Sequence, residues 1–108
     1  MSEQDFNIEE GSVTFWIESN KLNYSDGKST ILLNNSNKDG SIFIVKDKDN
    51  SLKFFHVYYG FGRTNVEIDV SRLNSNEKHF IGATWNIKEK KIVLYLDDKN
   101  SAESLIKY

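Results

Sequence analysis

Closely spaced clusters of turn-forming residues constrain the fold of this chain more than any other feature of its sequence. Asn, Asp, Gly and Ser gather at residues 23–29, 34–40, 47–51, 60–64, 74–78 and 86–91. These residue types favour turns, because Gly tolerates a positive φ and the other three bond to the nearby backbone. No segment between the clusters keeps a helical period for longer than one turn. The pattern therefore predicts short strands joined by tight connections.

The segments between these clusters alternate between apolar and polar residues, which is the period of a half-buried strand. In residues 12–18, Val13, Phe15 and Ile17 fall on one face, and Trp16 with polar residues falls on the other. The other strands are expected at residues 31–33, 41–46, 52–59, 65–70, 79–85, 91–97 and 102–106. About eight short strands predict an all-β, two-sheet antiparallel β-sandwich. The only helical candidate is a short piece at residues 71–77.

The length of 108 residues and the even spread of apolar residues predict a single domain at residues 11–108. Residues 1–10 are polar and acidic apart from Phe6 and Ile8, so we expect them to form an arm or a short edge strand. The chain has 38% hydrophobic and 13% aromatic residues, which is typical of a folded core. It contains no Cys, so this core must supply its stability without disulfides.

The charge of the chain argues against partners rich in phosphate. Its formal net charge is −2, its charges of both signs are interleaved, and only two of its fourteen basic residues are Arg. We therefore expect no nucleic-acid partner. No apolar run approaches the ~20 residues of a membrane span, and the first residues lack the basic and apolar regions of a signal peptide. We expect a soluble chain without a membrane partner, and its localisation stays open.

Three parts of the chain go beyond a general strand pattern: residues 11–17, residues 70–73, and the pair of segments 79–86 and 91–97. They resemble laminin G-like members of the concanavalin A-like superfamily of lectins and glucanases, which have a jelly-roll sandwich. In that family a His opens one strand, a Thr-Trp pair closes it, and the next strand ends in Leu-Tyr-hydrophobic-Asp-Gly. The resemblance extends over about residues 11–98.

The chain departs from this family at two points. Asp98 stands where the family has its Gly, and the family's usual opening and closing strands are not visible. The chain therefore resembles a short or minimal member, whose sandwich is open at an edge strand. The resemblance implies a non-catalytic module that recognises glycan or protein. It also implies extracellular or cell-surface use if the chain belongs to a larger protein.

Glu67 and Asp69 lie in a segment that resembles the start of the carboxylate motif of laminarinase-type glucanases. On one face of a strand their positions are roughly 7 Å apart. Retaining hydrolysis needs two carboxyls about 5–5.5 Å apart, one of them a general acid. The motif's third acidic residue is replaced here by Arg72. We therefore expect no enzyme activity and a solvated strand face, with one carboxylate paired to Arg63 or Arg72.

The two histidines show no catalytic pattern, because no nucleophile elbow accompanies them. His56 alternates in phase with Leu52, Phe54 and Tyr58 and is expected to be a satisfied residue of a partly buried sheet, although it stays a candidate ligand contact. His79 occupies a structural position of the family hairpin.

Residues 47–50 and 97–100 place Asp and Asn oxygens in turns, but neither segment fits a known Ca²⁺ loop. We therefore expect these segments to be ordinary turns and the protein to have no cofactor. A Ca²⁺ site remains the alternative.

The segment 54–61 contains five aromatic residues, and alternation prevents all of them from pointing into one core. Some of these rings must therefore contact solvent, a ligand or another chain. The candidate ligand contacts are Trp16, His56, Tyr58, Tyr59, Phe61, Arg63, Glu67 and Asp69. We expect either a recognition module for glycan or protein, or an assembly protein that associates through an open edge or an aromatic patch. We expect a homodimer with Phe55, Tyr59 or Phe61 in or beside the contact, whereas sugar binding by a monomer would favour the recognition module.

Overall fold

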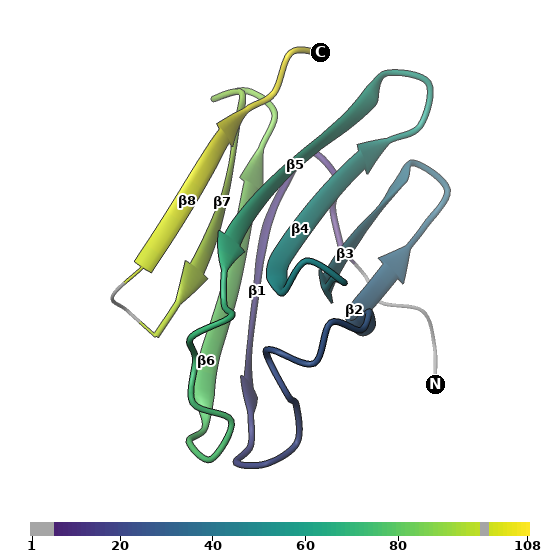
Figure 1. Ribbon diagram of the computed structural model, residues 1–108. Helices are drawn as coiled ribbons and strands as arrows, with labels where there is room; N and C mark the ends of the chain where they lie inside the picture. The colour runs from purple at the N-terminus through teal and green to yellow at the C-terminus, as the bar shows by residue number, and fades with distance from the viewer. Residues whose placement is uncertain (1–5, 98–99) are drawn as a thin grey trace.

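The computed structural model describes residues 6–97 and 100–108 and shows two antiparallel four-stranded sheets packed face to face (Figure 1). The strands are β1 (Glu10–Ile17), β2 (Thr30–Ser36), β3 (Gly40–Lys46), β4 (Ser51–Tyr58), β5 (Gly62–Asp69), β6 (His79–Asn86), β7 (Lys91–Leu96) and β8 (Asn100–Leu105). Each strand expected from the sequence is present, some of them longer by a few residues. The described residues contain no helix, so the expected all-β sandwich of about eight strands is confirmed.

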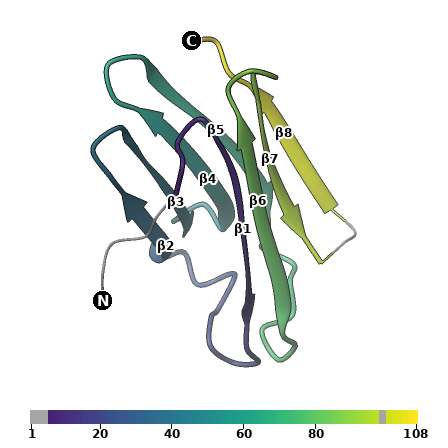
Figure 2. The same cartoon turned by 180° about the vertical axis from the view of Figure 1, so that it is seen from behind.

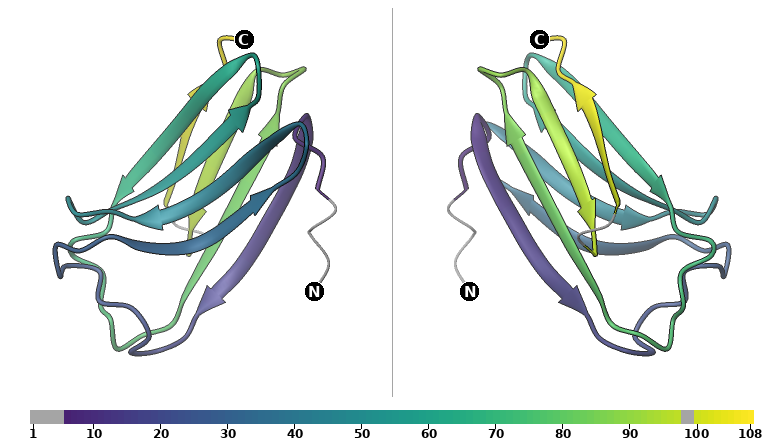
Figure 3. Two further views of the ribbon diagram at one scale, coloured as in Figure 1. Left: turned by 90° about the vertical axis from the view of Figure 1, so that its right-hand side faces the viewer. Right: turned by 90° about the vertical axis from the view of Figure 1, so that its left-hand side faces the viewer.

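The two sheets differ in how the chain builds them. One has the order β2-β3-β4-β5, in which each strand is joined to the next by a turn. The other has the order β1-β6-β7-β8, so its first strand comes from the beginning of the chain and the others from the end. The chain changes sheet between β1 and β2 and again between β5 and β6, and Figures 2 and 3 show the resulting two layers.

Residues 71–77 form turns, so the expectation of a short helix there is wrong. The segment connects one sheet to the other, and its polar groups form hydrogen bonds with residues nearby in the sequence. The carbonyl of Asn74 accepts hydrogen bonds from the Glu77 backbone and from the His79 ring. Its side-chain oxygen accepts the backbone N–H of Asn76 at 2.8 Å. These bonds replace the regular ladder of a helix.

The core lies between the sheets and is built from the apolar face of each strand. Trp85 is 3% exposed, as expected from its place on the face of Ile81 and Ala83. Its ring lies 6.1 Å from that of Phe54 across the gap between the sheets. Its indole N–H donates to the carbonyl of Asn7 at 2.7 Å, so the polar end of the ring is satisfied.

Residues 6–9 form no strand but tie the beginning of the chain to the opposite sheet. Ile8 is 2% exposed, and its carbonyl accepts a hydrogen bond from His56 Nε2 at 2.7 Å. The Phe6 carbonyl accepts a bond from the Asn37 side chain at 2.9 Å. Of the arm expected at residues 1–10, this described part is therefore packed against the domain.

At one side of the sandwich, β5 and β8 lie next to each other, and the end of the chain passes over the start of β5. Gly62 has a φ of 154°, and a Cβ at this position would lie 2.8 Å from the Tyr108 ring. The Tyr108 hydroxyl in turn lies 2.9 Å from His56 Nδ1. In Figures 1 and 3, the end of the chain and the β4–β5 turn lie at the same end of the molecule.

We expect Trp85→Ala to lower the free energy of unfolding by ~3–5 kcal/mol. The change removes a large buried ring and leaves a cavity that the surrounding side chains cannot fill. Urea denaturation followed by circular dichroism measures this change. The matched control is Trp16→Ala, since that ring is 54% exposed. A denaturation midpoint for Trp85→Ala equal to that of the control would contradict the packing described here.

Candidate functional site

The outer face of the β2-β3-β4-β5 sheet carries a row of four side chains that crosses all four strands. Alternation directs Phe43 and Phe55 away from the core, and the strand register places them opposite each other. Asn34 lies opposite Phe43 on the β2 side, and Asn65 lies opposite Phe55 on the β5 side. We call these four residues the aromatic row. It places two rings between two amides on a regular sheet.

The rings of the aromatic row form a stack that has one open end. The Phe43 and Phe55 centroids are 4.7 Å apart with an angle of 22° between the planes. The guanidinium carbon of Arg63 lies 5.8 Å from the Phe55 centroid, on the β5 side. Phe55 is therefore held between a ring and a cation, an arrangement that is favourable on both faces. The second face of Phe43 is directed toward β2.

A pocket of about 320 Å³ lies on this β2 side. It is lined by Ile31, Asn34, Ser36, Ser41, Phe43 and Tyr59, and we call it the Phe43 pocket. None of its lining residues is charged. Asn34 and Ser36 are exposed, and Tyr59 is 49% exposed, so an amide and hydroxyls lie at the rim beside an apolar ring. The volume is at the lower end of the range found for small-ligand sites.

One row further along the same face, Lys53 organises three carboxylates. Its Nζ lies 3.1 Å from Asp47 Oδ2, 3.2 Å from Asp49 Oδ2 and 3.9 Å from Glu67 Oε1. The hydrogen bonds to Asp47 and Asp49 raise the pKa of Lys53 above its ordinary value. The backbone N–H of Lys48, followed by the Lys53 ammonium, lowers the pKa of Asp47. The Lys53 ammonium thus pairs with the two Asp carboxylates that the sequence presents as candidate Ca²⁺ ligands.

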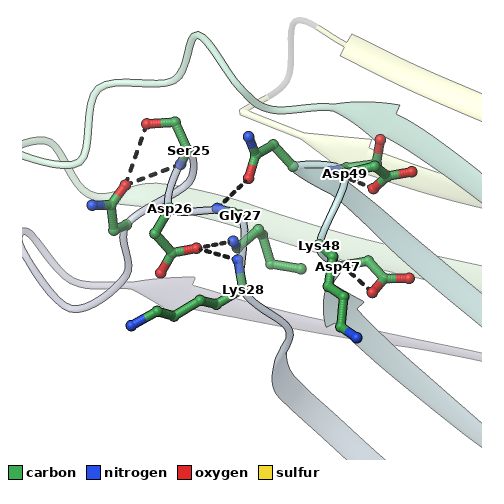
Figure 4. Close-up of polar contacts among 11 residues, drawn as sticks. Ser25, Asp26, Gly27, Lys28, Asp47, Lys48 and Asp49 are labelled. Atoms are coloured by element: carbon green, nitrogen blue, oxygen red, sulfur yellow. Dashed lines mark hydrogen bonds and ion pairs between the residues drawn. The ribbon is translucent and has the colours of Figure 1, made fainter.

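The turn at residues 47–50 also holds the loop that precedes β2 (Figure 4). The Gly27 N–H donates to Asn50 Oδ1 at 2.9 Å. The Asp26 carboxylate pairs with the ammonium of Lys46, whose side chain is fully buried. The Lys46 hydrogen bond, with a second from the Lys28 N–H, lowers the pKa of Asp26. Asp26 and Asn50 therefore hold the loop before β2 against β3 and the 47–50 turn.

The second acidic turn expected to offer oxygen ligands lies only partly within the described residues. Asp98 and Lys99 fall outside them. Asp97 is described, and its carboxylate binds the His79 ring and the Phe80 N–H. Among the described residues, no group of three or more His, Asp and Glu side chains is arranged to hold a metal ion.

His56 points into the interior and is 0% exposed, so it offers no surface to a ligand. Its Nε2 must carry a proton, because its partner, the Ile8 carbonyl, can only accept. Burial lowers the pKa of His56, since water no longer stabilises the charged ring. The Tyr108 hydroxyl lies 2.9 Å from Nδ1 of the neutral ring and 3.1 Å from the His56 carbonyl oxygen, so two acceptors share its one proton. His56 is thus a fully buried and hydrogen-bonded histidine without an exposed surface.

His79 is also buried, but its surroundings favour the charged ring. Burial opposes the charge, and the bonds to the Asn74 carbonyl and the Asp97 carboxylate outweigh that penalty, so the pKa of His79 is raised. Both partners are acceptors, at 2.8 Å from Nε2 and 2.6 Å from Nδ1, so only the imidazolium can donate to both. The Tyr24 ring packs edge-on against this pair. Burial and the Asp97 charge raise the pKa of Tyr24 to about 12.

The candidate contacts near the β4–β5 turn lie in different surroundings. Tyr58 points toward the core side, and its hydroxyl donates to Glu9 at 2.9 Å. Its ring lies 4.4 Å from that of Phe61, which is 64% exposed. Tyr59 faces outward and lines the Phe43 pocket. Of these rings, Tyr59 and Phe61 are thus the ones that a partner can reach.

Trp16 lies on the outer face of the other sheet, away from the remaining candidates. Its ring packs against Phe80 with centroids 5.1 Å apart, and Lys78 Nζ lies 4.8 Å from its centroid. The structure therefore separates Trp16 from Arg63, Glu67 and Tyr59, which share the outer face of the β2-β3-β4-β5 sheet. One ligand of small size cannot contact both groups.

Glu67 and Asp69 both face outward from β5, and each lies near a cation. Glu67 belongs to the Lys53 cluster. The backbone N–H of Ser71, followed by its side chain and then by the charge of Arg72, lowers the pKa of Asp69. A general acid needs the opposite change, a raised pKa. The two carboxylates therefore act here as partners of nearby cations and donors.

Sequence reasoning missed Phe43, Asn34 and the two serines of the Phe43 pocket. A signal for Phe43 is present, because it alternates with Ile42 and Ile44, which are buried at 1% and 0% exposure. Asn34 carries no such signal, since an extra residue in β2 between Ile31 and Leu33 shifts the register. Its place beside Phe43 follows only from the pairing of the strands.

No family model matches the sequence of this chain, and no curated protein matches it either. Within the described residues, no helix is long and apolar enough to cross a membrane.

The two histidines should give opposite pH dependences of stability. His79 has a raised pKa in the folded state, so its contribution is present below pH ~6.5 and is lost as the pH rises through that raised pKa. His56 has a lowered pKa, so its contribution is present above ~6.5 and is lost as the pH falls through the folded value.

We therefore expect His79→Gln to destabilise the protein more at pH ~5.5 than at pH ~8, and His56→Gln to do the reverse. Urea denaturation across this range gives the free energy of unfolding of each variant relative to the wild type. Parallel profiles for the two variants would show that the assigned protonation states are wrong.

Proposed function

We propose that this protein is a non-catalytic recognition module that binds a neutral saccharide unit in the Phe43 pocket. The observation that carries the proposal is the free face of the Phe43 ring, which borders a pocket without charged side chains. A sugar ring has an apolar C–H face, which packs on an aromatic ring, and a rim of hydroxyls. The Asn34 amide and the Ser36 and Tyr59 hydroxyls provide partners for that rim.

The arrangement of the site favours binding with little loss of conformational freedom. Phe43 is already packed against Phe55, and Arg63 lies on the far face of that second ring. Most of the lining residues belong to β2 and β3 rather than to long loops. A site built on strands keeps its side chains in place before the ligand arrives, which reduces the cost of binding.

The resemblance of residues 11–98 to laminin G-like domains supports the same proposal, because that family implies recognition of glycan or protein. The proposal that the module is non-catalytic rests on the carboxylates of the outer face. Asp69 has a lowered pKa and Glu67 lies beside Lys53, so neither has the environment of a general acid.

We expect Phe43→Ala to weaken binding to a neutral oligosaccharide by at least about tenfold, because an aromatic stacking contact of ~1 kcal/mol is lost together with buried area. A glycan array identifies the oligosaccharide, and isothermal titration calorimetry measures the affinity. Tyr95→Ala is the matched control, since this aromatic residue is 39% exposed on the other sheet. Equal binding by wild type and Phe43→Ala would overturn the proposal, as would a wild-type protein that binds no neutral glycan.

Self-association is the second candidate function, and the exposed rings at the β4–β5 turn favour it. Phe61 is 64% exposed and Tyr59 is 49% exposed, and Ile31 of the edge strand β2, which lines the same pocket as Tyr59, is 66% exposed. Exposed apolar groups gathered in this way are typical of contact surfaces. With a net charge of −2, repulsion between two copies is weak.

Sedimentation equilibrium distinguishes this candidate from a monomeric module. If the turn mediates a homodimer, the wild type should sediment as a dimer at micromolar concentration, and Phe61→Ser should shift the equilibrium to the 12.5 kDa monomer. A wild type that stays monomeric at high concentration would rule out the assembly function.

A further inference from the structure

A second pocket, on the opposite side of the aromatic row, has the character of an anion site. It measures about 240 Å³ and lies where the start of β5 meets the end of β8. Arg63, Asn65, Ser104, Lys107 and Tyr108 are among its lining residues, and we call it the seam pocket. It is separate from the Phe43 pocket but shares Arg63 and Asn65 with the surroundings of the aromatic row.

The charge of the seam pocket differs from that of the whole protein. The chain has a net charge of −2, yet the side chains that line this pocket include two cations, Arg63 and Lys107, and no Asp or Glu. The main-chain oxygen of the lining residue Tyr108 accepts a hydrogen bond from Lys90 Nζ at 2.8 Å. Within residues 6–97 and 100–108, neither Arg63 nor Lys107 makes an ion pair. Two such cations around one small cavity raise the local positive potential and favour an anionic group.

The shape and chemistry of the lining suit an anion that is carried on an organic molecule. The Arg63 guanidinium presents a planar fork that matches a carboxylate or sulfate, and Lys107 adds a second charge. Asn65 and Ser104 offer further hydrogen bonds. Leu105, which is 64% exposed, and the Tyr108 ring provide apolar surface beside these polar groups.

The aromatic row runs from the Phe43 pocket to the seam pocket, and its length fits an extended chain of sugar units. Asn34 and Asn65 mark the ends of the aromatic row and lie on β2 and β5, three strand spacings apart. At about 4.8 Å per spacing, this is roughly 14 Å. A sugar chain laid across the strands would therefore contact the neutral Phe43 pocket at one end and the cationic seam pocket at the other.

We propose that the seam pocket binds a carboxylate or sulfate group of a saccharide, so that the ligand of this module is an acidic glycan. This inference rests on the proposed function of the Phe43 pocket for the position of the neutral unit. Beyond that function, Arg63 and Lys107 bind the carboxylate or sulfate, and the sugar chain crosses the sheet from β2 to β5.

The first test isolates the seam pocket. Methyl β-glucuronide, methyl β-glucoside and acetate are titrated separately into ¹⁵N-labelled protein, and amide shifts are followed by NMR. We expect the glucuronide to shift the amides of Asn65, Ser104 and Lys107, and the glucoside to leave them unchanged. An equal response to glucoside and glucuronide, or no response to the glucuronide, would overturn the inference. A response to acetate as strong as that to the glucuronide would reduce the pocket to a simple anion site and would also overturn it.

Variants of the two cations test whether Arg63 and Lys107 bind the glucuronide. Lys107→Gln alone removes one charge without altering the aromatic row, and Arg63→Gln/Lys107→Gln removes both. We expect the double variant to weaken glucuronide binding by at least about tenfold, since it removes both charge-assisted hydrogen bonds to the carboxylate. The control is Lys21→Gln/Lys88→Gln, which makes the same change of net charge at two exposed positions. Equal weakening by the control would show that net charge, and not the seam pocket, is responsible.

The second test separates this inference from the proposed function. A neutral oligosaccharide selected on the array is compared with its counterpart in which one terminal unit is oxidised to a uronic acid. We expect the acidic form to bind at least about tenfold more tightly at low salt and to lose this advantage as salt screens the charges. Phe43→Ala should weaken both forms, and Lys107→Gln only the acidic one. Neutral binding without any preference for the acidic form would refute the seam pocket and leave the proposed function intact.

Discussion

The packing of apolar side chains between the two sheets decides what every strand presents to solvent. Because successive residues of a strand point to opposite faces, the burial of Ile42 and Ile44 forces Phe43 outward. The burial of Phe54, which packs against Trp85, does the same for Phe55. The two outward rings then meet because the strands pair in one register. The aromatic row is thus a consequence of how the core is filled.

The interior also contains polar groups, and two of them, His56 and Lys46, join parts of the chain that are distant in sequence. His56 binds the Ile8 carbonyl near the beginning of the chain and the Tyr108 hydroxyl at its end. Lys46, fully buried, is paired with Asp26 in the loop before β2. A buried polar group is costly when it loses its partner, so these contacts favour one arrangement of the loops over others.

The sequence was sufficient for the strands and their faces, but not for the site. Alternation predicts strand faces well, since it depends on neighbouring residues alone, and it correctly placed Trp85 in the core. The proximity of Asn34 to Phe43, or of Asp26 to Lys46, depends on pairing and on loop paths. The helix expected at residues 71–77 failed for a related reason, because that segment spans the two sheets and Asn74 bonds to His79. Local patterns contain no information on such contacts.

The extra residue in β2 has a consequence for how the molecule avoids joining other chains through its backbone. Among the strands of residues 6–97 and 100–108, β2 is an edge strand, and none of these strands pairs with its outer row of amide and carbonyl groups. The irregular pairing between Ile31 and Leu33 bends the strand and interrupts the even spacing that an incoming strand would have to match. Ordered stacking of sandwiches into fibres along this rim is thereby disfavoured. The same irregularity turns both Ile31 and Asn34 to the outer face, so one inserted residue both protects the edge and completes a wall of the Phe43 pocket.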